Sequence, residues 1–389
     1  MNNRPLIYLL ALSAFFAGTA ELVIAGIVDL IAENFNVSLA VSGQLVTVFS
    51  LSLALGSPIA IALTSKMNRK SLLLTTLACL TIGNLLAMLS GHIFALMMIS
   101  RIVLGISAGV STVVSLAIAA NLVESEKRGG AIANVQAGFS ISLVIGVPAG
   151  VLVASHWGWH AIFGALALAN ILILLLMVKM LPQIPRNQNA PKTQLTILRN
   201  PRVIGGLVVT FLNVLGYSIC YTYISPYLQT SAHFSLTAIS GILLLMGVCG
   251  TIGVRLGGYG SDRWGVNKTL FTMLAIHAAT LLLFPFLATT AIGAVTGIIV
   301  WGISAWSTVP TIFVYMMSLV PESAETAISV NTSIFQIGIA LGAVVGGLIV
   351  SGLSFSELGW IGGITVALGL ISAVLMLSPG KLKATFSKA

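Results

Sequence analysis

Long uninterrupted runs of apolar residues make up most of this chain, separated by short polar stretches. Twelve runs are long enough for a helix of about 20 residues to cross a hydrocarbon core. Apolar and polar residues do not alternate along the runs, as they would in the strands of a membrane β-barrel. The runs extend over residues 6–28, 39–63, 71–90, 93–120, 130–154, 159–181, 203–228, 236–259, 269–288, 292–320, 327–353 and 358–378. The pattern predicts an all-α polytopic membrane protein with twelve transmembrane helices.

The composition agrees with lipid as the main solvent of this chain. Of the 389 residues, 57% are hydrophobic and 7% are charged, with a mean hydropathy of +1.06. Soluble domains carry about 25% charged residues. The first run, which follows Arg4, has some features of a cleaved signal peptide. It continues past Glu21 to Val28, however, so we expect an uncleaved first helix.

The net charge of +9 has a simple explanation in the positions of the basic residues. If the amino terminus is cytoplasmic, every Lys and Arg outside the spans falls on the cytoplasmic side, as the positive-inside rule requires. The basic balance therefore sets orientation, with both termini in the cytoplasm, and does not indicate a nucleic-acid partner. The three cysteines lie in spans at unrelated positions, so we expect neither disulfides nor a metal site.

The longest polar stretch between spans divides the chain into two sets of six. Residues 182–201 carry four prolines and no apolar period, which predicts a cytoplasmic linker. We therefore expect an amino-terminal six-helix bundle over residues 1–181 and a carboxy-terminal one over residues 202–389.

The two halves also resemble each other in sequence. LGISAG at 104–109 matches WGISAW at 301–306 when the sequence is shifted by 197 residues, and Asn134 then meets Asn331. At a shift of 200, QAGFSISLVIG from Gln136 matches QIGIALGAVVG from Gln336. A parallel repeat of six helices is a secondary-transporter architecture. The fold prediction is therefore two pseudo-symmetric bundles.

Several motifs, in this order, resemble the major facilitator superfamily. GGYGSDRWGVNK (257–268) resembles its loop signature G-x-x-x-D-R-x-G-x-x-K, and RIVLGISAG (101–109) resembles its fourth-helix signature. GVPAG (146–150) resembles a reduced form of the antiporter signature in the fifth helix. TAELVIAGIVDLIAENFNVS with VWGISAWSTVP looks most like bacterial efflux pumps for sugars, purine nucleosides and drugs such as chloramphenicol.

The resemblance implies a proton-coupled drug/proton antiporter of the bacterial inner membrane. Such a protein exports small neutral or amphiphilic molecules by alternating access, works as a monomer and needs no cofactor other than the proton. The chain departs from the family pattern in places. Ser65 and Asn68 replace an Asp and a Gly of the first-half loop, and Val147 replaces a Gly of the antiporter signature. The last difference weakens antiport as a conclusion from that motif.

Three charged residues within the spans are candidates for proton coupling. Glu21 and Asp29 lie in the first run and Arg101 in the fourth, and charge at bilayer depth is costly and by default functional. Because the resemblance makes the first and fourth helices neighbours, Arg101 can reach either acid. One interpretation is a permanent Glu21–Arg101 ion pair that fixes packing. The other makes Glu21 the proton carrier, whereas Asp29 is more simply interfacial.

A second group of residues is predicted to act in conformational gating. Arg255 and Asp262 are seven residues apart, hence on one helix face, and are expected to pair or latch. Arg263 and Gly265 belong to the loop signature, and Pro148 to the fifth-helix signature.

Substrate-contact candidates are polar or aromatic residues of the helices that the resemblance places on the central cavity. Asn213, Tyr217 and Tyr221 form a stripe at helical spacing, for which helix packing is the alternative interpretation. Trp301 and Trp306 are five apart and cannot share a helix face, so only one is expected at the cavity. Gln136, Gln336 and Asn331 complete the candidates, all drawn from the repeat.

Other functions are less well supported by the sequence. His156 and His160 are spaced to hold a metal, but no third ligand is evident, and an interfacial aromatic cluster is favoured. A membrane-embedded enzyme would need a catalytic cluster, and a receptor would need a signalling domain. An importer or facilitator of the same fold remains an alternative, because coupling and gradients rather than fold set the direction.

Overall fold

The computed structural model describes residues 4–64, 66–124, 127–182, 195–320 and 323–377. Within these ranges the chain is helical and has no strand. Twelve helices are long and apolar enough to cross a membrane. They are Arg4–Leu22, Leu39–Leu63, Arg69–Met88, Phe94–Asn121, Arg128–Trp157, Trp159–Met180, Pro201–Tyr221, Leu236–Arg263, Val266–Leu287, Ala291–Leu319, Thr326–Gly352 and Ser356–Met376. The predicted fold class and number of spans are confirmed.

The helices group into two compact units. The first comprises Met1–Ala190 with Ser235–Gly247, and the second comprises Pro191–Phe234 with Val248–Ala389. The predicted bundle boundaries at 181 and 202 stay a prediction, and most of the predicted linker, residues 183–194, lies outside the described residues.

The first unit contains nine α-helices and two π-helical turns. The α-helices are α1 (Arg4–Leu22), α2 (Ile24–Phe35), α3 (Leu39–Leu51), α4 (Ser57–Leu63), α5 (Arg69–Met88), α6 (Phe94–Asn121), α7 (Arg128–Ile141), α8 (Val147–Trp157) and α9 (Trp159–Met180). The π-turns Ser52–Gly56 and Ser142–Gly146 join α3 to α4 and α7 to α8. A proline follows each turn within two residues, Pro58 and Pro148. Proline removes a backbone N–H, so the helix adjusts its hydrogen bonding at these points.

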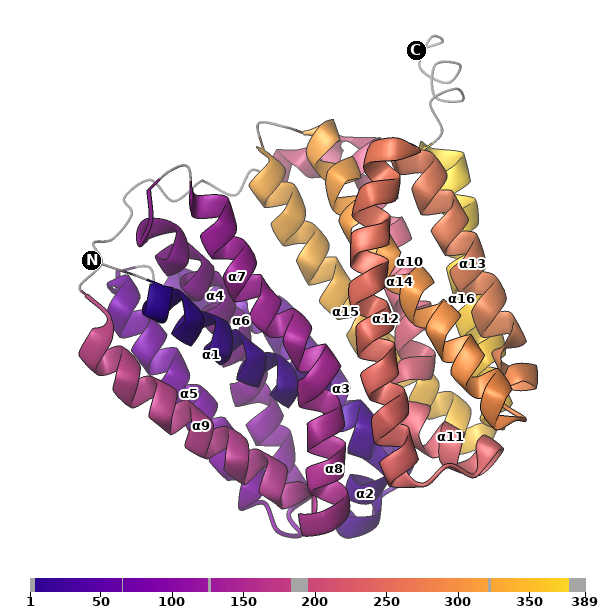
Figure 1. Ribbon diagram of the computed structural model, residues 1–389, viewed down its shortest axis with the longest axis horizontal. Coiled ribbons are helices and arrows are strands. Elements are labelled where there is room, and N and C mark those ends of the chain that lie inside the picture. Colours follow the sequence, from indigo (N-terminus) through magenta and orange to yellow (C-terminus); the bar gives the residue numbers. More distant parts are fainter. Residues whose placement is uncertain (1–3, 65, 125–126, 183–194, 321–322, 378–389) are drawn as a thin grey trace. The chain divides into compact units, whose positions relative to one another are not determined.

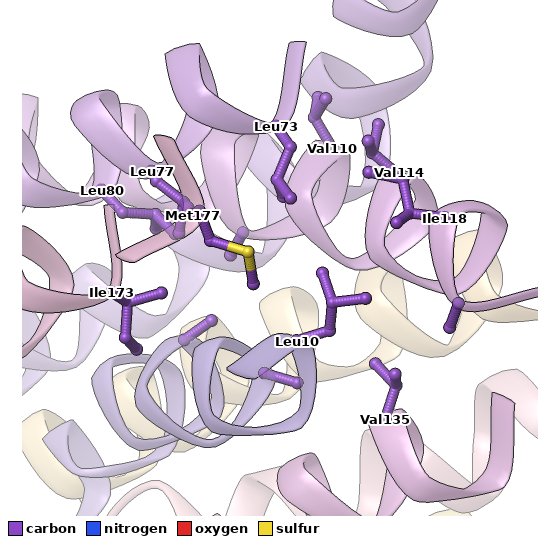
Figure 2. Packing of buried hydrophobic residues seen from close by; sticks show 14 of the residues in the cluster. Leu10, Leu73, Leu77, Leu80, Val110, Val114, Ile118, Val135, Ile173 and Met177 are labelled. Atoms are coloured by element: carbon purple, nitrogen blue, oxygen red, sulfur yellow. The ribbon is translucent and has the colours of Figure 1, made fainter. Parts of the chain in front are cut away.

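Apolar side chains fill the space between the helices of the first unit. Within it α1 lies beside α7, and α5 lies beside α6 and α9 (Figure 1). Figure 2 shows Leu10 of α1 meeting Leu73 of α5, Val114 of α6 and Met177 of α9. Lipid offers little hydrophobic driving force for helix association, so van der Waals packing of this kind holds the helices together.

The second unit is built from the remaining helices. They are α10 (Pro201–Tyr221), α11 (Ile224–Ala232), α12 (Leu236–Arg263), α13 (Val266–Leu287), α14 (Ala291–Leu319), α15 (Ala324–Gly352) and α16 (Ser356–Leu377), preceded by the 3₁₀ turn Leu195–Arg199. The first part of α12, up to Gly247, groups with the first unit. Within the second unit α10 packs on α15 and α16, and α13 packs on α14 and α16.

Equivalent glycines make the closest helix contacts in both units. A Cβ atom added at Gly138 of α7 would meet the backbone of Ala11 in α1. One added at Gly338 of α15 would lie 3.3 Å from the carbonyl oxygen of Phe211 in α10. Both members of the pair are displaced by 200 residues, so α1 with α7 and α10 with α15 are equivalent contacts of the repeat. The four-residue glycine spacing is thus used for close packing.

Candidate functional site

The first span is broken next to Glu21. The helix α1 ends at Leu22, α2 begins at Ile24, and Ile27 has non-helical dihedral angles (φ −134°, ψ 15°). The last four carbonyl groups of a helix have no donor within that helix. The backbone N–H of Val23 donates to the carbonyl of Thr19. The carbonyls of Ala20 and Glu21 belong to this exposed set and need donors from elsewhere.

Arg101 of α6 supplies those donors. Its side chain is fully buried, and its Nη1 and Nη2 donate to the carbonyl oxygens of Ala20 at 2.7 Å and Glu21 at 3.4 Å. Its Nε donates to the carbonyl of Leu45 in α3 at 3.3 Å, and the guanidinium carbon lies 4.4 Å from the ring centroid of Phe49. A fork of five N–H donors suits a guanidinium for bridging several acceptors. Arg101 therefore ties the broken first span to α3 and α6.

The structure brings Arg101 and Glu21 together through the main chain of Glu21. The Glu21 side chain itself is half-buried at the end of α1, and Asp29 is half-buried within α2, beyond the break. The sequence predicted that Arg101 reaches the first span, and the structure shows that its hydrogen bonds there go to backbone carbonyls. The roles of these three residues in proton coupling stay predictions.

A chain of polar side chains crosses the interior of the second unit. His277 of α13 lies with its Nδ1 2.9 Å from Oδ1 of Asn213 in α10, and Asn213 Nδ2 donates to Oγ1 of Thr308 in α14 at 3.0 Å. Thr210, one turn before Asn213, donates to Oδ1 of Asn331 in α15 at 2.7 Å. All five side chains are buried. Four helices of this unit are therefore linked by side-chain hydrogen bonds.

Aromatic rings adjoin this polar chain. Tyr217 stacks on Tyr221 with ring centroids 5.1 Å apart, and it lies 6.4 Å from His277. The rings of Trp301 and Trp306 lie 5.4 Å and 6.3 Å from Tyr217. The prediction that only one tryptophan would take part in such a cluster is therefore wrong. Their Cα positions point to different sides of α14, but the long indole side chains both reach Tyr217.

A cavity opens beside the polar chain, between α10, α13, α14 and α15. It holds about 300 Å³ of empty space, part of which is open to the surroundings. None of its lining side chains is ionisable. They are Val209, Thr210, Asn213, Val214, Leu270, Leu274, Thr308, Val309, Ile312, Phe313, Asn331 and Phe335. The cavity combines apolar walls with a few hydrogen-bonding groups, which is the usual construction of small-molecule sites.

The two glutamines of the repeat differ in their surroundings. Gln336 is buried in α15, the helix that carries Asn331, whereas Gln136 of α7 is exposed. Of the predicted substrate residues, the structure gathers those on α10 and α14 around Tyr217 and places Asn331 at the cavity. Gln136 belongs to the other unit.

The predicted pairing of Arg255 with Asp262 within one helix is not formed. Both side chains are exposed, and the described residues show no ion pair between them. Seven residues of an α-helix span about 10 Å along its axis, which is too far for the short aspartate to meet the guanidinium. Arg263 is exposed in the last turn of α12, where a cation is favoured by the helix dipole.

Two further signature residues shape the backbone. Gly265 joins α12 to α13 with φ +87° and ψ 150°, a conformation that side chains other than glycine rarely adopt. Pro148 is buried in the first turn of α8, directly after the π-turn Ser142–Gly146. Their part in gating stays a prediction.

The histidines at the loop between α8 and α9 belong to an aromatic cluster. His160 stacks on Trp159 with centroids 3.6 Å apart, and Trp159 lies 5.5 Å from Phe35. Across the described ranges no group of three potential metal ligands occurs.

Sequence reasoning missed three members of the polar chain. His277 is the only one of the five histidines that falls in the middle of a span, and this position was an available signal. Thr210 and Thr308 carry no such signal, because threonines in membrane helices commonly bond to their own backbone. Thr308 does so as well, donating to the carbonyl of Ala305 at 2.6 Å.

Comparison with known proteins identifies the family of this chain. The family model of the Major Facilitator Superfamily matches residues 10–343. The chain belongs to the major facilitator superfamily. It is 37% identical over 380 residues to the MFS-type transporter YbcL of Bacillus subtilis (strain 168), covering 97% of each chain. It is 32% identical over 371 residues to the inner membrane transport protein YdhP of Escherichia coli (strain K12), covering 95% of each.

Solved structures share the superfamily fold at low sequence identity. A bacterial homolog of the human lysosomal transporter Spinster gives a TM-score of 0.78 at 16% identity, covering 99% of this chain and 98% of that one. A D-xylose-proton symporter gives 0.78 at 16% identity, with coverage of 95% and 96%. The nucleoside transporter NupG gives 0.76 at 15%, with coverage of 97% and 100%. This member of the superfamily is therefore a multi-pass membrane transporter of small molecules and not an enzyme.

Proposed function

We propose that this transporter exports small neutral or amphiphilic organic molecules, of the nucleoside, sugar or drug class, in exchange for protons. Export would proceed by alternating access across a bacterial inner membrane, with both termini in the cytoplasm and the monomer as the working unit. The observation that carries the proposal is the buried Arg101 at the break beside Glu21.

The break supports a coupling role because it combines an ionisable acid with an adjustable backbone. Burial raises the pKa of a carboxyl group, and water or a nearby cation lowers it. A group whose surroundings alternate between these states takes up a proton on one side and releases it on the other. Arg101 stays charged and cannot carry the proton itself. Glu21 is therefore proposed as the carrier, with Arg101 as the cation that sets its charge.

The cavity in the second unit supports a neutral substrate. Its walls carry hydroxyl and amide groups but no acid or base. A charged substrate group would lose its hydration there without gaining a counter-ion, which is unfavourable. The aromatic rings around Tyr217 offer flat surfaces for the apolar part of such a molecule.

The direction and the coupling are tested together in membrane vesicles. Everted vesicles with an acidic interior should accumulate labelled inosine or chloramphenicol, because protons leaving the lumen drive substrate inward. Each proton that moves down the membrane potential supplies about 2.3 kcal/mol per 100 mV. Accumulation only in right-side-out vesicles would favour an importer. Equilibration without accumulation would favour a facilitator.

The role of Glu21 is tested by Glu21→Gln, which keeps the shape and hydrogen bonding of the protonated acid but cannot ionise. We expect this variant to exchange labelled for unlabelled substrate and to lose proton-driven accumulation. Asp29→Asn is the matched control and should accumulate substrate like the parent protein. Normal uphill transport by Glu21→Gln would make Glu21 structural and turn attention to Asp29.

A further inference from the structure

The cavity of the second unit contains a hydrogen-bond donor that the protein leaves unused. Asn331 of α15 lines the cavity, is fully buried, and receives the hydroxyl proton of Thr210 at its Oδ1. Its Nδ2 has no hydrogen-bond partner. Buried polar groups in proteins are almost always paired, so an unpaired donor in a cavity wall calls for an explanation.

The other polar groups in the cavity wall are already engaged. Thr210 donates to Asn331, and Asn213 donates through Nδ2 to Thr308. Since Oδ1 of Asn213 can only accept, Nδ1 of His277 must carry the proton that binds it. Thr308 accepts from Asn213 and donates to the carbonyl of Ala305. The wall therefore presents one free polar function, the amide N–H₂ of Asn331.

His277 also has an unpaired nitrogen but does not belong to this site. Its Nε2 lacks a partner, yet His277 is absent from the residues that line the cavity. The imidazole acts on the cavity through Asn213, whose amide it orients. Asn134, the repeat mate of Asn331 in α7, is exposed, so the arrangement is confined to the second unit.

We infer that the Asn331 amide is a recognition point for a neutral hydrogen-bond acceptor on the transported molecule, such as a carbonyl, hydroxyl, ether or ring-nitrogen atom. Phe313 and Phe335 in the same wall pack against the apolar part next to that acceptor. A carboxylate or phosphate does not fit, because no lining side chain balances its charge. The inference rests on the proposed function, in that the acceptor belongs to the substrate.

The experiment compares two probes of matched shape on the purified full-length protein in detergent. Cyclohexanecarbonitrile carries an acceptor nitrogen, whereas ethynylcyclohexane replaces it with a C–H group. We expect the nitrile to bind about tenfold more tightly, which is the effect of one hydrogen bond in a buried site. Binding to Asn331 should also shift the nitrile stretching frequency in the infrared.

Variants assign the signal to one residue. Asn331→Leu should abolish both the preference and the frequency shift. Asn84→Leu, at a buried asparagine of α5 whose Nδ2 donates to the carbonyl of Leu80, should leave both unchanged. Equal binding of the two probes to the parent protein overturns the inference, even if Asn331→Leu does not fold. A frequency shift that persists in Asn331→Leu also overturns it.

The test is independent of proton coupling, because no gradient is applied. Loss of vesicle accumulation with an intact nitrile preference would reject the proposed export while retaining the acceptor site. Normal export with equal probe binding would reject the acceptor site alone.

Discussion

Nη1 of Arg101 donates a 2.7 Å hydrogen bond to the carbonyl of Ala20, 81 residues earlier in the chain. A side chain of α6 thus replaces the backbone donor that α1 lacks at its end. In lipid no water is available to hydrogen-bond an exposed carbonyl, so an interrupted span needs such a partner. The broken first span depends on a single buried cation.

Removal of that cation should destabilise the first unit. Arg101→Met leaves the carbonyls of Ala20, Glu21 and Leu45 without their donor, and we expect a loss of about 3–5 kcal/mol in unfolding free energy. Arg101→Lys should recover only part, because one ammonium cannot span three acceptors. Unfolding in mixed micelles measures both. Arg255→Met, at an exposed arginine of α12, should change stability by less than about 0.5 kcal/mol. Equal effects at the two sites would contradict this interpretation.

Glycine and serine exchange places between equivalent contacts of the repeat. A Cβ atom at Gly18 of α1 would meet Ser142, which follows α7, and one at Gly342 of α15 would lie 2.5 Å from Cβ of Ser218 in α10. Both positions are offset by 200 residues. Each contact therefore tolerates one serine and requires glycine opposite it.

This exchange predicts a specific rescue. Gly18→Ser should overpack the contact and cost about 1–3 kcal/mol. Adding Ser142→Gly recreates the arrangement found at Ser218 and Gly342, and should restore about 1 kcal/mol or more. Recovery is expected to be partial, because the ring of Phe139 also lies 2.8 Å from the added Cβ. A thermal-unfolding double-mutant cycle measures the coupling, and strictly additive effects would show that the two sites do not compete for space.

The hydrogen bond between His277 and Asn213 should appear as coupling between the two residues. His277→Leu or Asn213→Leu alone leaves a buried partner unsatisfied and should cost about 1–3 kcal/mol each. The double variant should cost less than the sum, by about 1 kcal/mol. The control cycle pairs His277→Leu with Asn170→Leu, at a buried asparagine of α9 in the other unit. That cycle should be additive within about 0.5 kcal/mol, and coupling of equal size in both would refute the assignment.

Two glycines near the end of α12 should respond to alanine in opposite directions. Gly265 has φ +87°, so Gly265→Ala places a Cβ in an unfavourable conformation and should cost about 1–2 kcal/mol. Gly258 lies within α12, and a Cβ there meets nothing within 4 Å. Gly258→Ala should therefore stabilise by about 0.5–1 kcal/mol. The sign of each change in melting temperature decides the matter, and stabilisation by both substitutions would exclude strain at Gly265.

The spans and the repeat could be predicted from sequence because they depend on properties that accumulate along the chain. An apolar run of about 20 residues crosses a bilayer regardless of its neighbours. The run from Leu39 to Leu63 is predicted with the bounds that the structure shows, although the π-turn Ser52–Gly56 inside it is not predicted. That turn depends on how the helix accommodates Pro58 against its surroundings.

Candidate side chains were predicted with uneven success because chemistry identifies a residue but not its partner. Arg101 stood out as a charge in lipid, yet its acceptors are main-chain carbonyls that exist only because α1 ends at Leu22. Arg255 and Asp262 share a helix face but are too far apart to pair. His277 was overlooked, since its importance comes from Asn213 on another helix.

The sequence by itself determined that this protein lies in a membrane as two repeats of six helices, because hydropathy and internal similarity are carried by the residues in order. Only the tertiary structure decided which polar groups meet. Thr210 and Asn331 are 121 residues apart and form one hydrogen bond because α10 packs on α15. In a low-dielectric interior such pairing decides which polar group is satisfied and which, like Nδ2 of Asn331, is left for a ligand.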